Sequence, residues 1–362
     1  MGKKYLTQDK IRKNTLSDIF LYILEKKQTT RREIEHETGF SWGTVSENVA
    51  YLIDNDYVTE EKNKQKGIVG RTTYILKPTS DKVASIGLDI NLSGFSCTIL
   101  ALDSHVINKM EAKFTAKTQK ELLSQSEALC DKAVDWCNKK GLKIFSLGIA
   151  MQGDVNGKEG ICMRFPNIED WQPYNIKEHF AQKFNQPTYL GHDPKCMLLG
   201  QTQSADDCIL LRIDSGIGMA IMLDGKILYD AERFELGHTL AVDNGKKCSC
   251  GKKGCLEMYG TLSAISAKNE QDIFELPEKF SKELSEAGTY LAKALYNIYV
   301  LFKPQKLILT GKATQLTAFT DSAVKLLNAD ELEIVIDSNI SAAYGAAKES
   351  MKSAIKSFVY TK

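Results

Sequence analysis

The chain has 362 residues, of which 43% are hydrophobic and 26% are charged, and its formal net charge at pH 7 is +1. These values are ordinary for a soluble globular protein with two or three cores. No run of about 18 apolar residues occurs, and the stretch MGKKYLTQDKIRKN has no apolar core of the kind a signal peptide requires. We therefore expect no membrane partner and a cytoplasmic location.

Three helices are predicted at the start of the chain. Residues 14–26 carry one apolar helical stripe, which consists of Leu16, Ile19, Phe20, Ile23 and Leu24. Thr30 and Glu33 have the spacing of a capping box, and Gly39 suits a left-handed cap that ends this second helix. Ser41 can cap a third helix, whose inward side chains would be Val45, Val49, Leu52 and Ile53.

Two helices joined by a glycine turn, with a hairpin-like stretch after them at 57–76, indicate a winged helix-turn-helix. Residues 1–77 carry 14 Lys and Arg against 11 Asp and Glu, which alone is weak evidence for nucleic acid. Arg71 in the wing could enter a minor groove. An alternative is a protein-docking module whose polar face is merely solvated. For operator DNA as the partner, the third helix offers polar side chains on its exposed face: Ser41, Trp42, Thr44, Ser46 and Asn48.

A linker is predicted at residues 78–82, where Pro78 and the turn-favouring residues after it break the pattern. It would separate a DNA-binding domain, residues 1–77, from a second domain, residues 83–362. Within the second domain the order strand-strand-strand-helix-strand occurs twice, and 226–230 is the predicted third strand of the second copy. This duplication suggests an α/β fold of the ribonuclease-H-like type found in sugar kinases and actin, with two lobes that hold a ligand between them.

The stretch 246–260, KKCSCGKKGCLEMYG, puts three cysteines into eight positions, Cys248, Cys250 and Cys255. With His238 as the nearest fourth ligand they predict a Cys₃His zinc site, in which Gly251 and Gly254 let the backbone wrap around the ion. Because all four ligands come from the protein, the zinc would be structural. The alternative is a loop of reduced structural cysteines.

The other six cysteines are predicted to be small core residues rather than a disulfide framework: Cys97, Cys130, Cys137, Cys162, Cys196 and Cys208.

The segment FELGH, followed by CSCGKKGCLE, resembles the signature of the ROK family of sugar kinases and sugar-responsive repressors. The resemblance extends over roughly residues 14–350, and the front helices with a Gly-Arg wing resemble the repressor branch. Three further segments are similar to family motifs and follow their order: MQGDV at 151–155, FPNIEDW at 165–171 and GHDPKCMLLGQ at 191–201.

The resemblance implies which residues would hold a sugar or sugar phosphate: Asn167, Asp193, Glu235, His238 and Glu257. Carboxylates and amides suit the hydroxyl rim of a pyranose, and the zinc loop would hold Glu235 and Glu257 in place. Singly, Glu257 could be a surface acid and Asn167 a turn former.

Phosphoryl transfer would require a base and a cradle for phosphates. Asp193 resembles the family's base. Where family kinases have Asp-x-Gly-Gly-Thr, however, this chain reads DINLS at 89–93, and their later Gly-Gly is Gly-Lys at 311–312. In DSGIGMA at 214–220, Asp214 would repel a phosphate unless a metal intervened. The phosphate-binding motifs are therefore degenerate, which argues against an enzyme.

These features predict a sugar-responsive transcriptional regulator, a repressor, that acts as a homodimer or homotetramer. The first alternative is an active ATP-dependent sugar kinase that carries a DNA-binding domain. The second alternative is a zinc-stabilised regulator that is controlled by a protein partner. His192 and Gln201 replace family residues near the predicted sugar site, so ligand preference can differ from that of glucose-type binders.

Overall fold

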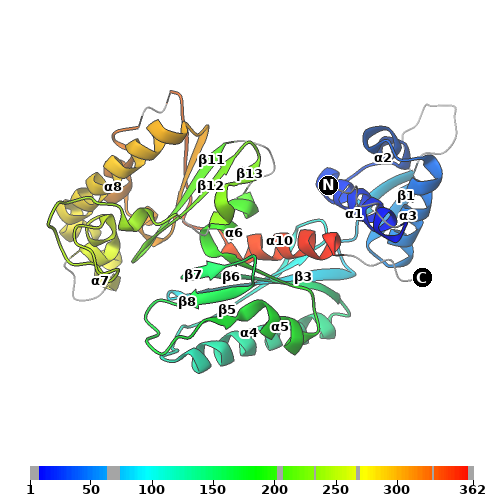
Figure 1. The fold of residues 1–362 in the computed structure, drawn as a ribbon, viewed down its shortest axis with the longest axis horizontal. Helices are drawn as coiled ribbons and strands as arrows, with labels where there is room; N and C mark the ends of the chain where they lie inside the picture. Colours follow the sequence, from blue (N-terminus) through cyan, green and yellow to red (C-terminus); the bar gives the residue numbers. More distant parts are fainter. Residues whose placement is uncertain are drawn as a thin grey trace, which may run out of the picture. The chain divides into compact units, whose positions relative to one another are not determined.

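The computed structural model describes residues 8–62, 74–201, 207–231, 234–265, 270–327 and 330–357 (Figure 1). The chain divides into two compact units, Met1–Gly191 with Ala346–Lys362, and His192–Gly345. Among the described residues, no helix is both long enough and apolar enough to cross a bilayer.

The first unit begins with three helices: α1 (Gln8–Lys26), α2 (Arg31–Thr38) and α3 (Trp42–Asp54). The predicted helix ends are confirmed. Thr30 and Glu33 form a reciprocal capping box on α2, and Gly39 closes that helix with a φ of 70°. The Ser41 hydroxyl accepts a hydrogen bond from the backbone of Thr44 and so caps α3. Helix α1 starts earlier than the predicted residue 14, and its stripe is buried except for Leu24, which is half-buried.

A hairpin follows these helices. Strand β1 (Val58–Lys62) pairs antiparallel with β2 (Tyr74–Pro78), and Val58 lies opposite Pro78. Pro78 is therefore the last residue of β2, which is an edge strand of a two-stranded sheet, and proline is tolerated in edge strands. β3 begins at Val83, so residues 79–82 form the connection. The tip of the predicted wing, with Arg71, lies outside the described residues, and the domain division at 78–82 stays a prediction.

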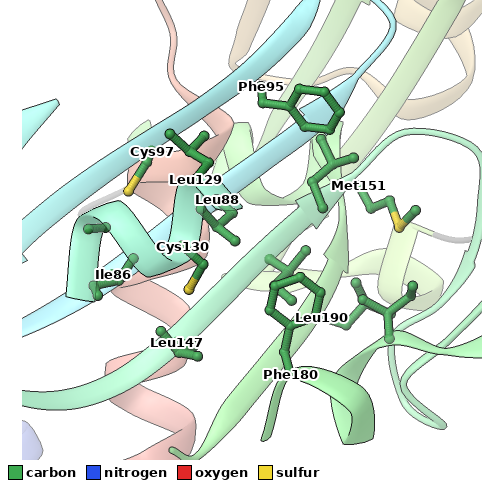
Figure 2. Close-up of a cluster of buried hydrophobic side chains, with 14 of the residues drawn as sticks. Ile86, Leu88, Phe95, Cys97, Leu129, Cys130, Leu147, Met151, Phe180 and Leu190 are labelled. Atoms are coloured by element: carbon green, nitrogen blue, oxygen red, sulfur yellow. The ribbon is translucent and has the colours of Figure 1, made fainter. Parts of the chain in front are cut away.

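The first large sheet has the strand order β10-β6-β3-β4-β5. β3 pairs antiparallel with β4 and parallel with β6, and all nine residues of β3 are buried. Figure 2 shows the apolar cluster that these strands form with two helices, to which Leu129 of α4 and Phe180 of α5 contribute. The elements are β3 (Val83–Asn91), β4 (Gly94–Ala101), β5 (Val106–Ala112), α4 (Gln119–Lys139), β6 (Lys143–Met151), α5 (Ile176–Phe184) and β10 (Thr188–His192), with a small sheet of β7 (Asp154–Asn156), β8 (Ile161–Arg164) and β9 (Tyr174–Asn175).

Helix α10 (Ala342–Lys356) packs its backbone directly against β6. A Cβ on Gly148 would lie 2.0 Å from the carbonyl oxygen of Ala346, so no larger residue fits there without displacement. Nearby, the buried hydroxyls of Ser85, Ser146 and Ser350 form a chain with 2.8 Å between successive oxygens. Ser350 then donates to a carbonyl oxygen of its own helix, so this polar chain is satisfied inside the core.

The N-terminal helices also contact this part of the unit. Pairing of β3 with β6 skips Phe145, and a bulged residue of this kind can point away from the regular faces of a sheet. The Phe145 ring lies 6.2 Å from that of Phe20 and 5.4 Å from that of Tyr57, measured between centroids. Ser17 of α1 donates a 2.7 Å hydrogen bond to the carbonyl oxygen of Ile355, near the end of α10. Helix α1 is thereby joined to β6 and to α10.

The second unit repeats the first topology. Its sheet has the order β13-β12-β11-β14-β15, in which β11 pairs antiparallel with β12 and parallel with β14, as β3 does with β4 and β6. The predicted duplication is therefore confirmed. The predicted strand 226–230 is wrong beyond its first two residues, because a 3-10 helix (Leu228–Ala231) replaces it.

The remaining elements of this unit surround the sheet. Apolar side chains of β11 pack with those of α8 and α9, while α6 contacts β11 and β12. The bounds are α6 (Asp193–Gln201), β11 (Cys208–Ile213), β12 (Ile217–Leu223), β13 (Lys226–Ile227), α7 (Glu270–Glu275), α8 (Ser281–Phe302), β14 (Lys306–Thr310), α9 (Thr317–Val324) and β15 (Glu333–Ile336), with short 3-10 helices at Leu236–His238, Leu256–Met258, Leu262–Ala264, Pro277–Phe280 and Lys312–Gln315.

Replacing Gly148 by alanine should lower the thermal midpoint, because the new methyl group would overlap the α10 backbone; overpacking of this kind costs about 1–3 kcal/mol. Thermal denaturation followed by circular dichroism measures the effect. Gly43→Ala is the control, since its Cβ would meet only the Ser41 hydroxyl at 4.0 Å. Equal midpoints for Gly148→Ala and the unchanged chain would contradict the close packing.

Candidate functional site

The cysteine-rich loop folds back on itself tightly. Isolated bridges pair Leu240 with Cys255 and Lys247 with Lys253. Gly254 has a φ of +80°, and a Cβ there would lie 1.8 Å from the carbonyl oxygen of Val242. Glycine is thus required by both the conformation and the space.

This fold brings four side chains together: His238, Cys248, Cys250 and Cys255. One ligand atom from each lies within 4.8 Å of all the others. The Sγ atoms of Cys250 and Cys255 are 3.5 Å apart, and Cys248 Sγ is 3.6 Å from His238 Nδ1. Thiolates that bind one zinc tetrahedrally at about 2.3 Å are about 3.8 Å apart, so the spacing suits a metal ion of this size.

The loop shifts the pKa values of two of these thiols in opposite directions. The backbone N–H of Lys252 donates to Cys250 and lowers the pKa of that thiol. Burial raises the pKa of the Cys255 thiol to about 12, and hydrogen bonds with Cys250 and Cys248 add to this rise. Because a metal binds thiolates, Cys250 is the most readily available sulfur ligand of this pair, and a bound cation would drive deprotonation of Cys255.

Two predicted sugar ligands lie beside this cluster. The Nε2 atom of His238 is 3.7 Å from a carboxylate oxygen of Glu235, so the imidazole has the cluster on one side and a carboxylate on the other. Glu257 follows Cys255 on a 3-10 helix, and its carboxylate accepts a 3.4 Å hydrogen bond from the backbone of Ile217. The cysteine loop therefore positions Glu257 against the turn that precedes β12.

Asp193 begins α6 and is buried. Its carboxylate forms an ion pair with Arg212 on β11, and Arg212 Nε donates to Asp214 at 2.7 Å. Arg212 was not among the residues predicted from the sequence. Arg212 is the one charged residue in the apolar strand CILLRI, which could have indicated a buried ion pair. Nothing in the sequence indicated which carboxylates would face it.

The other predicted residues occupy separate places. Asn167 belongs to the first unit, is exposed and has a φ of 59°. On α3, Ser41 and Trp42 are exposed, and Thr44 and Ser46 are half-buried. Asn48 was predicted to lie on the exposed face, and this is wrong: it is 8% exposed, and its amide donates to the carbonyl oxygen of Thr44. One helical turn separates Asn48 from the buried Val45, so it shares the inner face.

The sequence profile of the ROK family matches residues 85–333. The chain belongs to the ROK family. A xylose repressor of Caldicellulosiruptor bescii is 29% identical over 252 residues, which make up 67% of this chain and 62% of the repressor. A xylose repressor of Bacillus spizizenii is 25% identical over 310 residues, or 79% of each chain.

Solved structures share the fold. A ROK family transcriptional regulator, described as a homologue of the Escherichia coli Mlc protein, superposes with a TM-score of 0.80 at 19% identity and covers 96% of this chain and 97% of its own. A ROK family glucokinase from Streptomyces griseus, in complex with glucose and AMPPNP, has a TM-score of 0.63 at 18% identity and covers 74% of this chain and 99% of its own.

Substitution of Cys250 or Cys255 by serine should reduce the bound metal of the purified protein from about one ion per chain to a small fraction, because each change removes one of four ligands. Plasma mass spectrometry measures the content. Ser249→Ala changes the same loop without removing one of the four ligand residues and should keep the metal. Full metal occupancy in the two cysteine variants would contradict this assignment.

Proposed function

We propose that this chain is a sugar-responsive transcriptional repressor that binds operator DNA and a sugar and acts as a homodimer or homotetramer in the cytoplasm. The observation that carries the proposal is that three N-terminal helices and a hairpin precede, in the same chain, a region that matches the ROK family over residues 85–333. The repressor names of two relatives that match this chain support the same activity.

In this proposal α2, the Gly39 turn and α3 form the helix-turn-helix, and the β1–β2 hairpin is its wing. Trp42 at the start of α3 is 44% exposed, which is high for a large aromatic side chain and suits contact with DNA. Ser41 and Thr44 bond to each other across the first turn of α3 and would face phosphates or base edges. Asn48 has no part in this surface. Arg71 remains the proposed contact of the wing.

Zinc is the metal we propose for the Cys₃His cluster. Three thiolates and an imidazole suit zinc in a reducing compartment, and four protein ligands leave no position open for a reacting water. The ion would therefore stabilise the loop. Through His238 it would also orient Glu235, and through the short helix after Cys255 it would hold Glu257.

The proposed sugar ligands of the second unit are Asp193, Glu235, His238 and Glu257, and Asn167 of the first unit remains a prediction from the sequence. Carboxylate oxygens can accept from adjacent hydroxyls of a pyranose, and Glu257 is held by a backbone N–H that leaves further acceptor capacity. Asp193 contributes a second acceptor at the start of α6.

Sugar binding would reach the DNA-binding helices through α10. The first four residues of this helix belong to the second unit and the rest to the first unit. Near its end, the carbonyl oxygen of Ile355 accepts from Ser17 of α1. Any change in the second unit that moves α10 would thus act on the position of α1. The two sites would then influence each other's affinity equally.

If the wing contacts DNA, Arg71→Ala should weaken operator binding and reduce the slope of log affinity against log salt by about one unit, because one phosphate contact is lost. Fluorescence anisotropy over a salt series measures both quantities. Lys282→Ala removes a charge from an exposed position on α8 and should leave the slope unchanged. An unaltered slope for Arg71→Ala would remove the wing from the DNA interface.

Sugar and operator should weaken each other's binding by the same factor. Thermal-shift screening with xylose, glucose and N-acetylglucosamine selects a ligand, and operator titrations with and without it measure the factor. Glu257→Gln should lower sugar affinity roughly tenfold through loss of a charge-assisted hydrogen bond, with operator affinity unchanged in the absence of sugar. Glu278→Gln, an exposed acid of the same unit, is the control.

A sugar that binds tightly but leaves operator affinity unaltered would overturn the sensor role. A protein partner would then be the better candidate for the signal.

A further inference from the structure

In each large sheet, the strand that comes first in the chain pairs parallel with another strand. These pairs are β3 with β6 and β11 with β14. In α/β proteins, ligands commonly bind beyond the carboxyl ends of such strands. Backbone N–H groups in the turns at these ends can hold phosphate oxygens. What these N–H groups contact in this chain therefore bears on which ligands it accepts.

At the edge of the first sheet, side chains of the protein already occupy the donors. The N–H of Leu92 donates to Gln152 Oε1 at 2.9 Å, and the N–H of Ser93 donates to Asn91 Oδ1 at 2.8 Å. The backbone of Gln152 is itself fixed, because its backbone N–H donates to the carbonyl oxygen of Ile90 at 3.0 Å. An incoming phosphate would have to displace these oxygens.

At the edge of the second sheet, a carboxylate has the same role. Asp214 Oδ1 accepts from the backbone N–H of Lys312 at 2.6 Å, and its Oδ2 accepts from Arg212 Nε at 2.7 Å. Oδ1 also lies 2.9 Å from the position that a Cβ on Gly311 would take. Asp214 is 8% exposed, so this negatively charged group is packed into the turn rather than directed to solvent.

Arg212 extends the arrangement to the predicted sugar site. Its Nη1 donates to Asp193 Oδ2, and the other oxygen of Asp193 lies 3.3 Å from His192 Nε2. Each oxygen of Asp193 therefore has a neighbouring group in the protein. A guanidinium paired with two carboxylates also has no surplus charge with which to attract a phosphate.

We propose that Asp214, paired with Arg212, is an internal replacement for a phosphate group, and that it restricts the predicted sugar site to neutral sugars by excluding phosphate-bearing ligands from the edge of the second sheet. Asp214 and Arg212 are then specificity-determining residues. Arg212 also positions Asp193 as a hydrogen-bond acceptor for a sugar hydroxyl. Because Asp193 is the carboxylate that a kinase would need as a base, its ion pair with Arg212 makes it less available to accept a proton. The proposal rests on the proposed function only in taking the predicted sugar site to bind a sugar.

The probes are AMPPNP with magnesium and inorganic pyrophosphate, titrated calorimetrically into the full chain. Asp214→Ala removes the internal carboxylate and should bind at least one probe about tenfold or more tightly than the unchanged chain does. The two probes distinguish a nucleotide from a phosphate group alone, and a gain with either supports the proposal. Asp321→Ala, which removes an exposed acid from α9, should behave as the unchanged chain.

Asp214→Asn keeps the size of the side chain and an acceptor for the Lys312 N–H but loses the charge paired with Arg212. It should give a smaller gain, and it tests the proposal if thermal denaturation shows that Asp214→Ala does not fold. Equal affinities for the unchanged chain and the folded Asp214 variants, including no binding by any of them, would overturn the proposal. Thermal shifts with sugars test the proposed function separately, because the phosphate comparison does not require that any sugar binds.

Discussion

The contact of α10 with β6 is the constraint on which the first unit depends. A helix backbone can lie on this strand only because Gly148 has no side chain, and the resulting approach allows Ser146 to reach Ser350. The same helix then ends where its Ile355 carbonyl oxygen accepts from α1. Sheet, C-terminal helix and N-terminal helices are therefore held by short-range contacts that a small displacement of α10 would disturb.

In the second unit, ion pairs of buried carboxylates connect the elements. Arg212 joins the start of α6 to the turn after β11, and Asp214 joins that turn to the one after β14. Glu257 approaches the next residues of the same turn from the cysteine loop. The buried ion pair and Glu257 of the cysteine loop thus contact the two ends of one short segment, residues 214–217. A buried charge left alone there would be costly, so the groups depend on one another.

Local signals in the sequence predicted much of the fold. The capping box at Thr30 and the left-handed cap at Gly39 depend on a few adjacent residues, and the structure contains both. The spacing of three cysteines and one histidine predicted the cluster, because their ligand atoms are brought together by a short loop. Asn48 was misplaced because polarity was taken as exposure, whereas helical periodicity puts it beside Val45 and Val49.

The sequence by itself thus predicted the duplicated topology and the four residues of the candidate metal centre, since these follow from periodicity and spacing along the chain, and its motifs indicated the family by resemblance. Only the tertiary structure decided which partners Arg212 and Asp214 have, which strand α10 covers and where the bulged Phe145 points. In the contact of α10 with β6, Ser146 and Ser350 are 204 positions apart in the chain. The geometry of these contacts depends on strand register and on the space left by glycine, which no short segment encodes.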